Sequence, residues 1–452
     1  MAEWSNAPDS KSGIRVLPYR GFESLPFRQH QDARHKRAFL FVPSTTLLAA
    51  PTLDPYSRLA ALAALLPALL VSARLVRRFG APATSGRHVT IDGLRGYLAL
   101  GVFLHHAAIW YGYVRTGVWD VPPSHLYTHG GQTSVALFFM ITGFLFIGRL
   151  LDARERGTPV DWGRLMVGRV LRLVPLYLVA MALLLGLVLA VSGGVLQVPI
   201  GRLVTGLLRW LNFFAAGKPD LNGVEHTWIL IAGVVWSLQY EWLFYLALPA
   251  IGLALEQRPS WGWRLVGTLA LVKLLLITFD GGARWRAEAF LGGAAAAWLV
   301  RSPRWCGWAA TPVASLAVLA LLGLTVAGFP TAYQAAPWLL LSAAFALIAG
   351  GADLFGVLRH PVSRLLGELS YSLYLLHGLL LFATWRFVVG FEAARDLTPL
   401  QHWGVVVLLV PVLVLASFWT HRLIELPPLR HTDALIARLR RSTAAAVSPP
   451  PR

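Results

Sequence analysis

The chain has 452 residues, of which 56% are hydrophobic and 14% are charged, with a formal net charge of +18. Soluble domains carry about 25% charged residues, so this composition excludes an ordinary soluble protein and indicates a polytopic membrane protein. The positive charge does not indicate nucleic-acid binding, because Lys and Arg collect in the cytoplasmic loops of membrane proteins. One cysteine, Cys306, excludes an internal disulfide and a metal site built from several cysteines, and we expect no metal.

The N-terminal region precedes the apolar part of the chain. Residues 1–55 are polar and basic and do not resemble a signal peptide, so we expect a disordered tail. Residues 56–88 hold an apolar run, 59–73, and a basic linker. This run contains Pro67 and is shorter than the roughly 20 residues of a span, so it is either an extra membrane helix, which we favour, or an interfacial segment.

Ten later segments are long and apolar enough to cross a membrane, and we expect helices because exposed strand edges are excluded from lipid. They cover about residues 91–113, 131–151, 170–192, 229–254, 264–280, 285–301, 308–328, 335–352, 367–390 and 403–424. The sequence therefore predicts an all-α, polytopic integral membrane protein with a ten-helix core over residues 89–428. The segment 199–215 carries Arg202 and Arg209, which indicates a re-entrant or interfacial helix.

The loop charges support this topology. If residue 91 is cytoplasmic, the connection 149–172 is also cytoplasmic, and it contains six arginines. On the other side, residues 114–130 contain only Arg115, and residues 329–334 contain no Lys or Arg. The longer outside stretch, residues 199–228, contains three such residues. The alternation fits the positive-inside rule and places both ends of the core, with the basic C-terminal tail 429–452, in the cytoplasm.

The first predicted span carries polar groups that lipid does not tolerate without partners. Arg95 and His106 are eleven residues apart, so they lie within about 20° of one helix face and about 16 Å apart along the axis. Alone, Arg95 fits a cationic anchor and a mid-membrane His fits an interhelical hydrogen bond. Together they suggest a path in which an anion binds at Arg95 and chemistry takes place at His106.

This Arg–His spacing resembles that of the membrane acyltransferase 3 family, whose members O-acylate sugars. Five further stretches strengthen the resemblance, which covers about residues 90–428: TSVALFFMITGFLF (133–146), RLMVGRVLRLVPLY (164–177), WSLQYEWLFYLALP (236–249), LGELSYSLYLLH (366–377) and IELPPLR (424–430). Thr142 stands where the family has Ser. Two tryptophans, Trp228 and Trp236, compete for one family position, and Trp236 fits better because Ser237 and Glu241 follow it.

Acyl transfer to a hydroxyl needs a base, a group that stabilises charge on the carbonyl, and a positioned donor. His106 is the candidate base, either removing the hydroxyl proton or carrying the acyl group. Glu241 is expected at a similar depth, where its carboxylate would orient the imidazole, unless it is a structural carboxylate paired with Lys273. The catalytic candidates are therefore His106, Glu241 and Arg95.

Two further sets of side chains are candidates for contact with the acceptor or the acyl group. Ser370, Tyr374 and His377 share one helix face at positions i, i+4 and i+7. The second set is Trp236, Ser237 and Tyr240. Packing inside a helical bundle would also explain each of them.

The resemblance implies acyl-coenzyme A as the donor substrate, with acetyl as the expected acyl group and no permanently bound cofactor. Coenzyme A carries phosphates, so a cytoplasmic arginine cluster is the candidate donor site, although the topology rule alone would also place arginines there. Its members are Arg149, Arg164, Arg169 and Arg172. Glu425 and Arg422 are expected to pair and close the same pocket.

The expected function is an integral-membrane O-acyltransferase of a bacterial inner membrane that acylates a hydroxyl of a glycan or other glycoside, with modification across the membrane as one possibility. Its expected partners are acyl-coenzyme A, the glycan acceptor and the lipid bilayer, with no nucleic acid. The alternative is a non-enzymatic transporter of a lipid-linked sugar or anion that uses the same polar residues as a pathway. The sequence shows no repeated halves with broken helices of the kind common in transporters, and the arginine cluster of the candidate donor site favours the enzyme.

Overall fold

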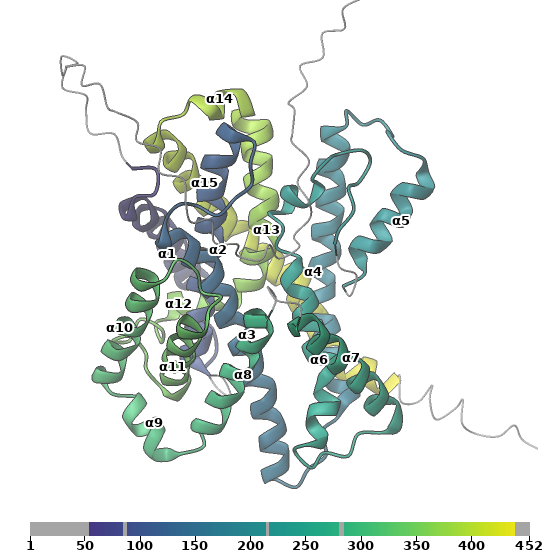
Figure 1. Cartoon of the computed structure of the whole chain (residues 1–452), viewed down its shortest axis with the longest axis vertical. Coiled ribbons are helices and arrows are strands. Elements are labelled where there is room, and N and C mark those ends of the chain that lie inside the picture. The colour runs from purple at the N-terminus through teal and green to yellow at the C-terminus, as the bar shows by residue number, and fades with distance from the viewer. Residues whose placement is uncertain (1–53, 85–87, 214–216, 280–283, 439–452) are drawn as a thin grey trace, which may run out of the picture.

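The computed structural model describes residues 54–84, 88–213, 217–279 and 284–438. Within these ranges the chain forms helices and no β-strand (Figure 1), which confirms the predicted all-α class. Almost all of the tail predicted over residues 1–55, and the end of the tail predicted over 429–452, fall outside the described residues.

The helices follow one another with short connections. In chain order they are α1 (Arg58–Phe79), α2 (Val89–Thr116), α3 (His125–Glu155), α4 (Trp162–Val191), α5 (Ile200–Leu211), η1 (Thr227–Ile231), α6 (Trp236–Leu253), α7 (Trp261–Phe279), α8 (Arg284–Leu299), α9 (Pro303–Ala309), α10 (Pro312–Gly328), α11 (Ala335–Gly350), α12 (Pro361–Glu368), α13 (Ser370–Ala383), η2 (Thr384–Val389), α14 (Phe391–Asp396), α15 (Pro399–Thr420), η3 (His421–Glu425) and α16 (Leu426–Arg430).

Several helices have the length and hydropathy of membrane spans. Among the described residues, 5 helices are long and apolar enough to cross a membrane, or up to 6 if α9 and α10, which meet at 75°, form one bent span. This supports a multi-pass membrane protein but not the full set of ten predicted spans. One of the 5 is α1, whose 22 residues extend beyond the apolar run predicted over 59–73. The polar residues of α2 lower its hydropathy and keep it out of this group.

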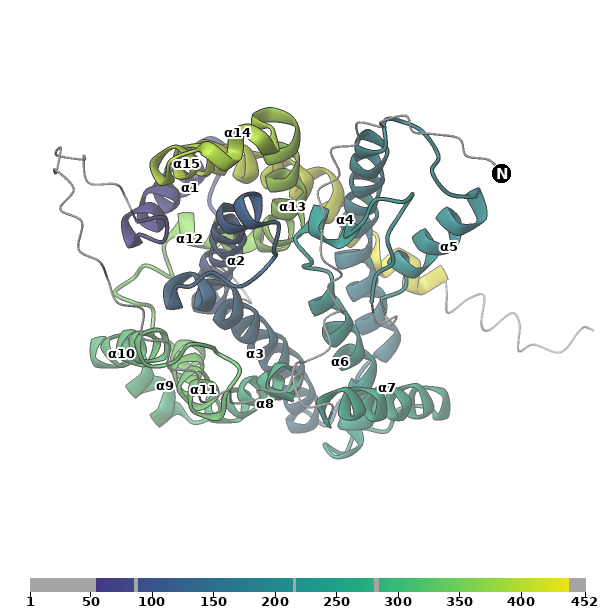
Figure 2. The same cartoon turned by 45° about the horizontal axis from the view of Figure 1, so that its top comes forward.

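α2 lies in the interior of the helical assembly, packed against α3, α12 and α13 (Figures 1 and 2). Glycines allow the closest approaches. A Cβ atom on Gly367 would lie 1.6 Å from the carbonyl oxygen of Asp92, so the end of α12 packs backbone to backbone on the first turn of α2. Phe103 and Trp110 are fully buried farther along α2. This packing fixes the rotation of α2, and with it the direction in which its polar side chains point.

The single helix predicted over residues 229–254 is wrong, because the structure divides it into the 3-10 turn η1 and the helix α6. Between them Ala232 and Gly233 have φ angles of +51° and +65°, which interrupt the helix. The break packs directly against α13, since a Cβ atom on Gly378 would lie 2.4 Å from the carbonyl carbon of Ile231. It frees backbone carbonyls for side-chain partners.

The helix α5 has the geometry of an interfacial segment, one of the two alternatives predicted for residues 199–215. Its 12 residues are too few to span a membrane. Ile200, Val204 and Leu208 expose one apolar face, as in amphipathic helices that lie in the membrane surface. Lys218 donates hydrogen bonds to the carbonyls of Arg209, Trp210 and Asn212 at the end of α5. Burial there, together with Arg209, lowers the pKa of Lys218 to about 8.

The crossing of α3 and α8 depends on glycine and gives a test of the fold. A Cβ atom on Gly293 would lie 1.9 Å from the carbonyl oxygen of Met140. We expect Gly293→Ala to lower the free energy of unfolding by about 1–3 kcal/mol, because the two backbones must separate. A thermal melt of the purified protein in detergent measures this change.

The matched control is Gly186→Ala in α4, where no atom lies within 4 Å of the new Cβ position. This variant should be neutral or more stable by up to about 1 kcal/mol, because alanine favours the helix. Equal melting temperatures for the two variants would contradict the close crossing.

Candidate active site

Two imidazoles from distant parts of the chain meet in the interior. Nε2 of His377, on α13, lies 3.0 Å from Nδ1 of His106, on α2, and the two rings stack with centroids 5.1 Å apart. His377 is fully buried, and His106 is half-buried. The structure thus joins two residues that the sequence marked as separate candidates, 271 positions apart.

Two backbone carbonyls show which ring nitrogen of each histidine carries the hydrogen. Nδ1 of His106 lies 3.0 Å from the carbonyl oxygen of Val102, and Nδ1 of His377 lies 3.1 Å from that of Leu373. A carbonyl oxygen only accepts hydrogen bonds, so each Nδ1 carries the hydrogen. Nε2 of neutral His377 is then an acceptor, and it shares the single Nδ1–H of His106 with the carbonyl of Val102. Nε2 of His106 then carries a lone pair, for which the described residues provide no hydrogen-bond donor.

This arrangement suits proton transfer. The Nε2 lone pair of His106 can take a proton from a hydroxyl, and the resulting cation is oriented and stabilised by its Nδ1–H bond to His377. The neighbouring His105 points elsewhere, because its Nδ1 donates to the carbonyl of Tyr127 at 2.8 Å. Among the described residues, no group of three or more His, Cys, Asp or Glu side chains could hold a metal ion.

Glu241 does not occupy the expected position beside His106. Within the described chain, its carboxylate accepts hydrogen bonds from the hydroxyl of Thr142, at 3.3 Å, and from the hydroxyl of Tyr245. The partner of His106 is the second imidazole instead. Sequence spacing had predicted the depth of Glu241 but not the direction of its side chain, which points to α3.

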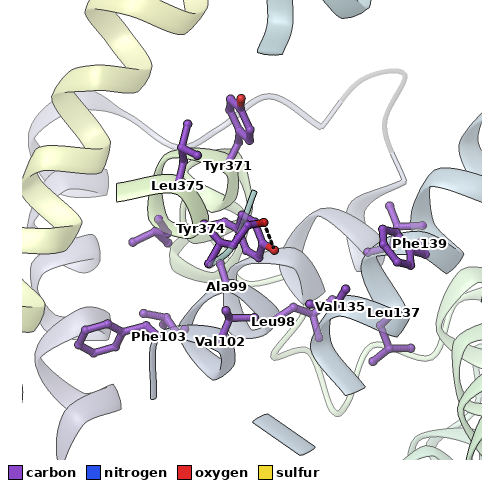
Figure 3. Close-up of a cluster of buried hydrophobic side chains, with 14 of the residues drawn as sticks. Leu98, Ala99, Val102, Phe103, Val135, Leu137, Phe139, Tyr371, Tyr374 and Leu375 are labelled. Atoms are coloured by element: carbon purple, nitrogen blue, oxygen red, sulfur yellow. Dashed lines mark hydrogen bonds between the residues drawn. The ribbon is translucent and has the colours of Figure 1, made fainter. Parts of the chain in front are cut away.

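A hydroxyl cluster lies between Glu241 and the histidine pair. The hydroxyls of Ser237 and Tyr374 lie 2.8 Å apart, and both are 3.1 Å from the carbonyl oxygen of Val234 at the helix break. The ring of Tyr374 lies 6.1 Å from that of His377 and close to Ala99 of α2 (Figure 3). Ser370, one turn earlier on α13, is buried, and its hydroxyl has no hydrogen-bond partner among the described residues.

Trp236 and Tyr240 lie beside a cation that sequence analysis missed. The guanidinium of Arg286 is 4.8 Å from the ring of Trp236 and 5.1 Å from that of Tyr333. Tyr240 packs on Trp236 and on Phe139, with centroids 5.7 and 5.9 Å apart. Cation–π contacts hold this group together. Arg286 starts a predicted span, and the topology rule gave no reason to single it out.

The arginine cluster forms a cavity, as the sequence predicted for three of its four members. Arg149, Arg164 and Arg169 line a cavity of about 860 Å³ between α3, α4 and α8. Arg156, Arg301 and His88 also line it. Arg164 additionally pairs with Asp433 at 2.8 Å, where both side chains are exposed. Asp152 and Asp161 line it as well, and Asp152 pairs with Arg301 at 2.5 Å. The arginines outnumber these carboxylates, so the cavity has a net positive charge that suits an anionic ligand.

The fourth arginine, Arg172, turns away from this cavity. Its guanidinium pairs at 2.7 Å with Glu425, which is fully buried and also accepts a hydrogen bond from Ser372. The predicted pairing of Glu425 with Arg422 is wrong, because the guanidinium of Arg422 lies 4.8 Å from the ring of Phe79. The sequence placed the carboxylate and two arginines at one end of the core, but it could not choose between the arginines.

Arg95 lies on the first turns of α2, with its guanidinium 3.8 Å from the carboxylate of Asp92. The residue from this end of α2 that lines the cavity is His88, just before the helix. The structure therefore places Arg95 in the half of α2 nearer the cavity, as predicted, but not in the cavity wall.

A row of polar side chains leads from the cavity to the histidine pair. The guanidinium of Arg169 lies 5.9 Å from the ring of Tyr245, whose hydroxyl donates to Glu241. Ser237 lies one helical turn before Glu241 on α6. Its hydroxyl contacts that of Tyr374, which lies next to His377. Polar side chains therefore lie at intervals between the cavity and the histidine pair, namely Arg169, Tyr245, Glu241, Ser237 and Tyr374, and we call this set the polar route.

One comparison with known proteins found a match. A family model described as an acyltransferase domain, that of acyltransferase 3, matches residues 88–422, which is more than half of the chain. A search of curated proteins found no match, and neither did a search of solved structures. The matched range runs from His88 at the cavity to Arg422 in η3, and it includes both histidines of the pair.

The buried ion pair gives a prediction that separates structure from ligand binding. Removing the charge of the fully buried Glu425 by Glu425→Gln leaves the guanidinium of Arg172, whose side chain is only 15% exposed, without its counter-ion. We expect a loss of about 3–5 kcal/mol in the free energy of unfolding. The melting temperature in detergent measures it.

The double variant Arg172→Gln/Glu425→Gln removes both charges and should recover much of that loss. Arg164→Gln, at the exposed pair with Asp433, is the control and should change stability by less than about 1 kcal/mol. A double variant no more stable than Glu425→Gln alone would contradict a direct coupling of the two charges.

Proposed function

We propose, on the premise that the chain belongs to the acyltransferase 3 family, that it is an O-acyltransferase that uses acyl-coenzyme A, with acetyl the simplest acyl group. The acceptor is a hydroxyl of a glycan or other glycoside. The observation that carries this proposal is the bond between His106 and His377, which leaves a basic nitrogen at the end of a polar route from a cationic cavity.

The proposed reaction is a direct transfer. Nε2 of His106 takes the proton of the acceptor hydroxyl as its oxygen attacks the thioester carbonyl. The C–O bond forms, the C–S bond breaks, and the proton returns from His106 to the leaving thiolate of coenzyme A. His377 holds the Nδ1–H of His106 throughout and stabilises the transient imidazolium.

The cavity supports the donor assignment. Coenzyme A carries phosphate groups, and Arg149, Arg164 and Arg169 offer guanidinium groups that suit them. Arg172 is not part of the proposed donor site, because its guanidinium forms an ion pair with the carboxylate of Glu425. In a bacterial inner membrane, the arginine-rich ends of α3 and α4 would face the cytoplasm, where acyl-coenzyme A is made.

A transporter of an anion or a lipid-linked sugar would use the same polar route without breaking a bond. The His106–His377 contact favours the enzyme, since its tautomers leave a lone pair suited to general-base catalysis. Release of free coenzyme A during transfer separates the two functions, because transport of an anion releases none.

The main test replaces each imidazole. We expect His106→Gln to lower acyl transfer at least about 100-fold, because the amide cannot act as a base. His377→Gln should lower kcat by about tenfold or more while leaving the KM for acetyl-coenzyme A unchanged. The measurement is thiol release from acetyl-coenzyme A by purified protein, together with mass analysis of acetylated surface glycans in cells.

The control is His125→Gln, an exposed imidazole at the end of α3 away from the cavity, whose Nδ1 lies 3.1 Å from the carbonyl oxygen of Val326. It should keep full activity. Wild-type rates in His106→Gln would remove this residue from the chemistry, and coenzyme A release by neither wild type nor control would favour the transporter.

The donor site is tested at the cavity wall. Arg169→Gln should raise the KM for acetyl-coenzyme A about tenfold, the loss of about 1.4 kcal/mol expected for one charge-assisted contact. Arg154→Gln is the control, because Arg154 pairs with Glu256 at 2.5 Å and lies outside the cavity wall. Equal KM values for the two variants would place the donor elsewhere.

A further inference from the structure

The helix α1 lies outside the domain that the family model matches, which begins at residue 88, and yet it packs on that domain. It lies beside α15 (Figure 2) and also contacts α12. Small side chains on one side of α1 are buried by this packing, and we call them the alanine face: Ala60, Ala64, Ala68 and Ser72. Small residues spaced four apart let helix backbones approach closely, as is common between helices within a membrane.

The other side of α1 is a stripe of exposed leucines, which we call the leucine face. Its members are 48–67% exposed and are Leu59, Leu62, Leu66 and Leu70. At about 100° per residue, these positions point away from the alanine face. Water does not favour such a stripe, whereas the acyl chains of lipid would cover it. The 22 residues of α1 measure about 33 Å, close to the roughly 30 Å of the apolar layer of a bilayer.

The start of α1 lies at the face of the protein opposite the arginine-lined cavity. The carbonyl oxygen of Pro55 accepts a hydrogen bond from Nε1 of Trp403, at 2.7 Å, in the first turn of α15. The carbonyl oxygen of Ser57 accepts one from the hydroxyl of Tyr127, at 2.9 Å, in the first turn of α3. The cavity is at the other end of α3, where Arg149 lines it.

The end of α1 lies at the same face as the cavity. The ring of Phe79 is 4.9 Å from that of Phe418, near the end of α15. Just beyond α1, the carbonyl oxygen of Pro82 accepts a hydrogen bond at 2.7 Å from Arg364 of α12, which packs on α2. α1 therefore runs parallel to α15 and crosses the whole thickness of the helical assembly.

The charges next to α1 agree with this direction. Residues 38–57 contain no Lys or Arg, and Arg58 is the one cation at the start of the helix. Residues 74–87, at its end, contain four arginines. The positive-inside rule counts the cations within about 15–20 residues of a span. It therefore assigns the end of α1 to the cytoplasm, the side to which the loop charges also assign the cavity.

We infer that α1 spans the membrane, docked on α15, with its leucine face against lipid acyl chains and its start on the side opposite the cavity. The chain that precedes α1 then lies on that side as well. Residues 1–53 contain seven Lys and Arg residues, and these cations cannot add to the proposed donor site. This role of α1 holds whether or not the protein transfers an acyl group.

The sides on which the two ends lie are measured by thiol labelling in sealed, right-side-out membrane vesicles. The background is Cys306→Ala, which removes the single native cysteine, and each variant adds one cysteine at an exposed position. We expect a membrane-impermeant maleimide to label Asp54→Cys in sealed vesicles, but Arg78→Cys only after the vesicles are opened. The references are Val118→Cys, between α2 and α3, and Ser260→Cys, between α6 and α7 on the cavity side.

The leucine face is tested in the wild-type protein. A lipid-soluble diazirine, activated by light in the bilayer, inserts into side chains that face the acyl chains, and mass spectrometry of peptide fragments assigns the label. We expect Leu62, Leu66 and Leu70 to be labelled at least about threefold more than Leu75, because lipid reaches only side chains that other helices leave uncovered. Leu75 is the matched control, a leucine of the same helix that is only 7% exposed.

Either of two results would overturn the inference. If Asp54→Cys reacts only in opened vesicles, as Ser260→Cys should, both ends of α1 lie on one side and α1 is not a span. If the exposed leucines are labelled no more than Leu75, another helix, such as that of a second copy, covers the leucine face instead of lipid. Melting temperatures identify any variant that fails to fold. Arg77→Cys, also exposed, replaces Arg78→Cys in that case, and the photolabelling needs no substitution.

Discussion

In an apolar interior a buried N–H needs an acceptor, and the Nδ1–H of His106, besides its contact with the carbonyl of Val102, is accepted by Nε2 of His377 in a bond between α2 and α13. The carbonyls of Val102 and Leu373 fix the direction of that bond, because they cannot donate. Because these hydrogen bonds occupy the Nδ1 atoms of both rings, Nε2 of His106 is the nitrogen that can accept a proton. The reactive nitrogen is therefore a consequence of how the buried polar groups are paired.

The helix break between η1 and α6 helps to position α13, the helix that carries His377. Inside a membrane, a broken helix is stable only where its freed carbonyls find partners within the protein. The carbonyl of Val234 accepts hydrogen bonds from Ser237 and Tyr374, and the latter lies on the face of α13 that carries His377. Close packing of Gly378 on the break brings α13 into position. The irregular backbone and the paired imidazoles thus stabilise one arrangement of α6 and α13.

Sequence analysis predicted the features that depend on periodicity and composition. It failed where the rotation of a helix about its axis decides which partner a side chain meets. The all-α class, the inward face of α2 and the cavity arginines follow from apolar runs, spacing and loop charge. The spacing of Glu241 gave its depth, but only the packed structure shows that its carboxylate faces Thr142 and Tyr245 rather than His106. Arg172 was misassigned for a similar reason, since its partner Glu425 lies far along the chain.

The two ends of α2 differ in chemistry, and this difference bears on how the proposed substrates would meet. Arginines surround the end at His88, and tryptophans surround the end at Trp119. His106 lies about 26 Å along α2 from its first residue and about 15 Å from its last, so a donor held by the arginines is farther from the base than a substrate at the other end of the helix. On the proposed function, the acyl group therefore crosses most of the apolar layer before the ester forms.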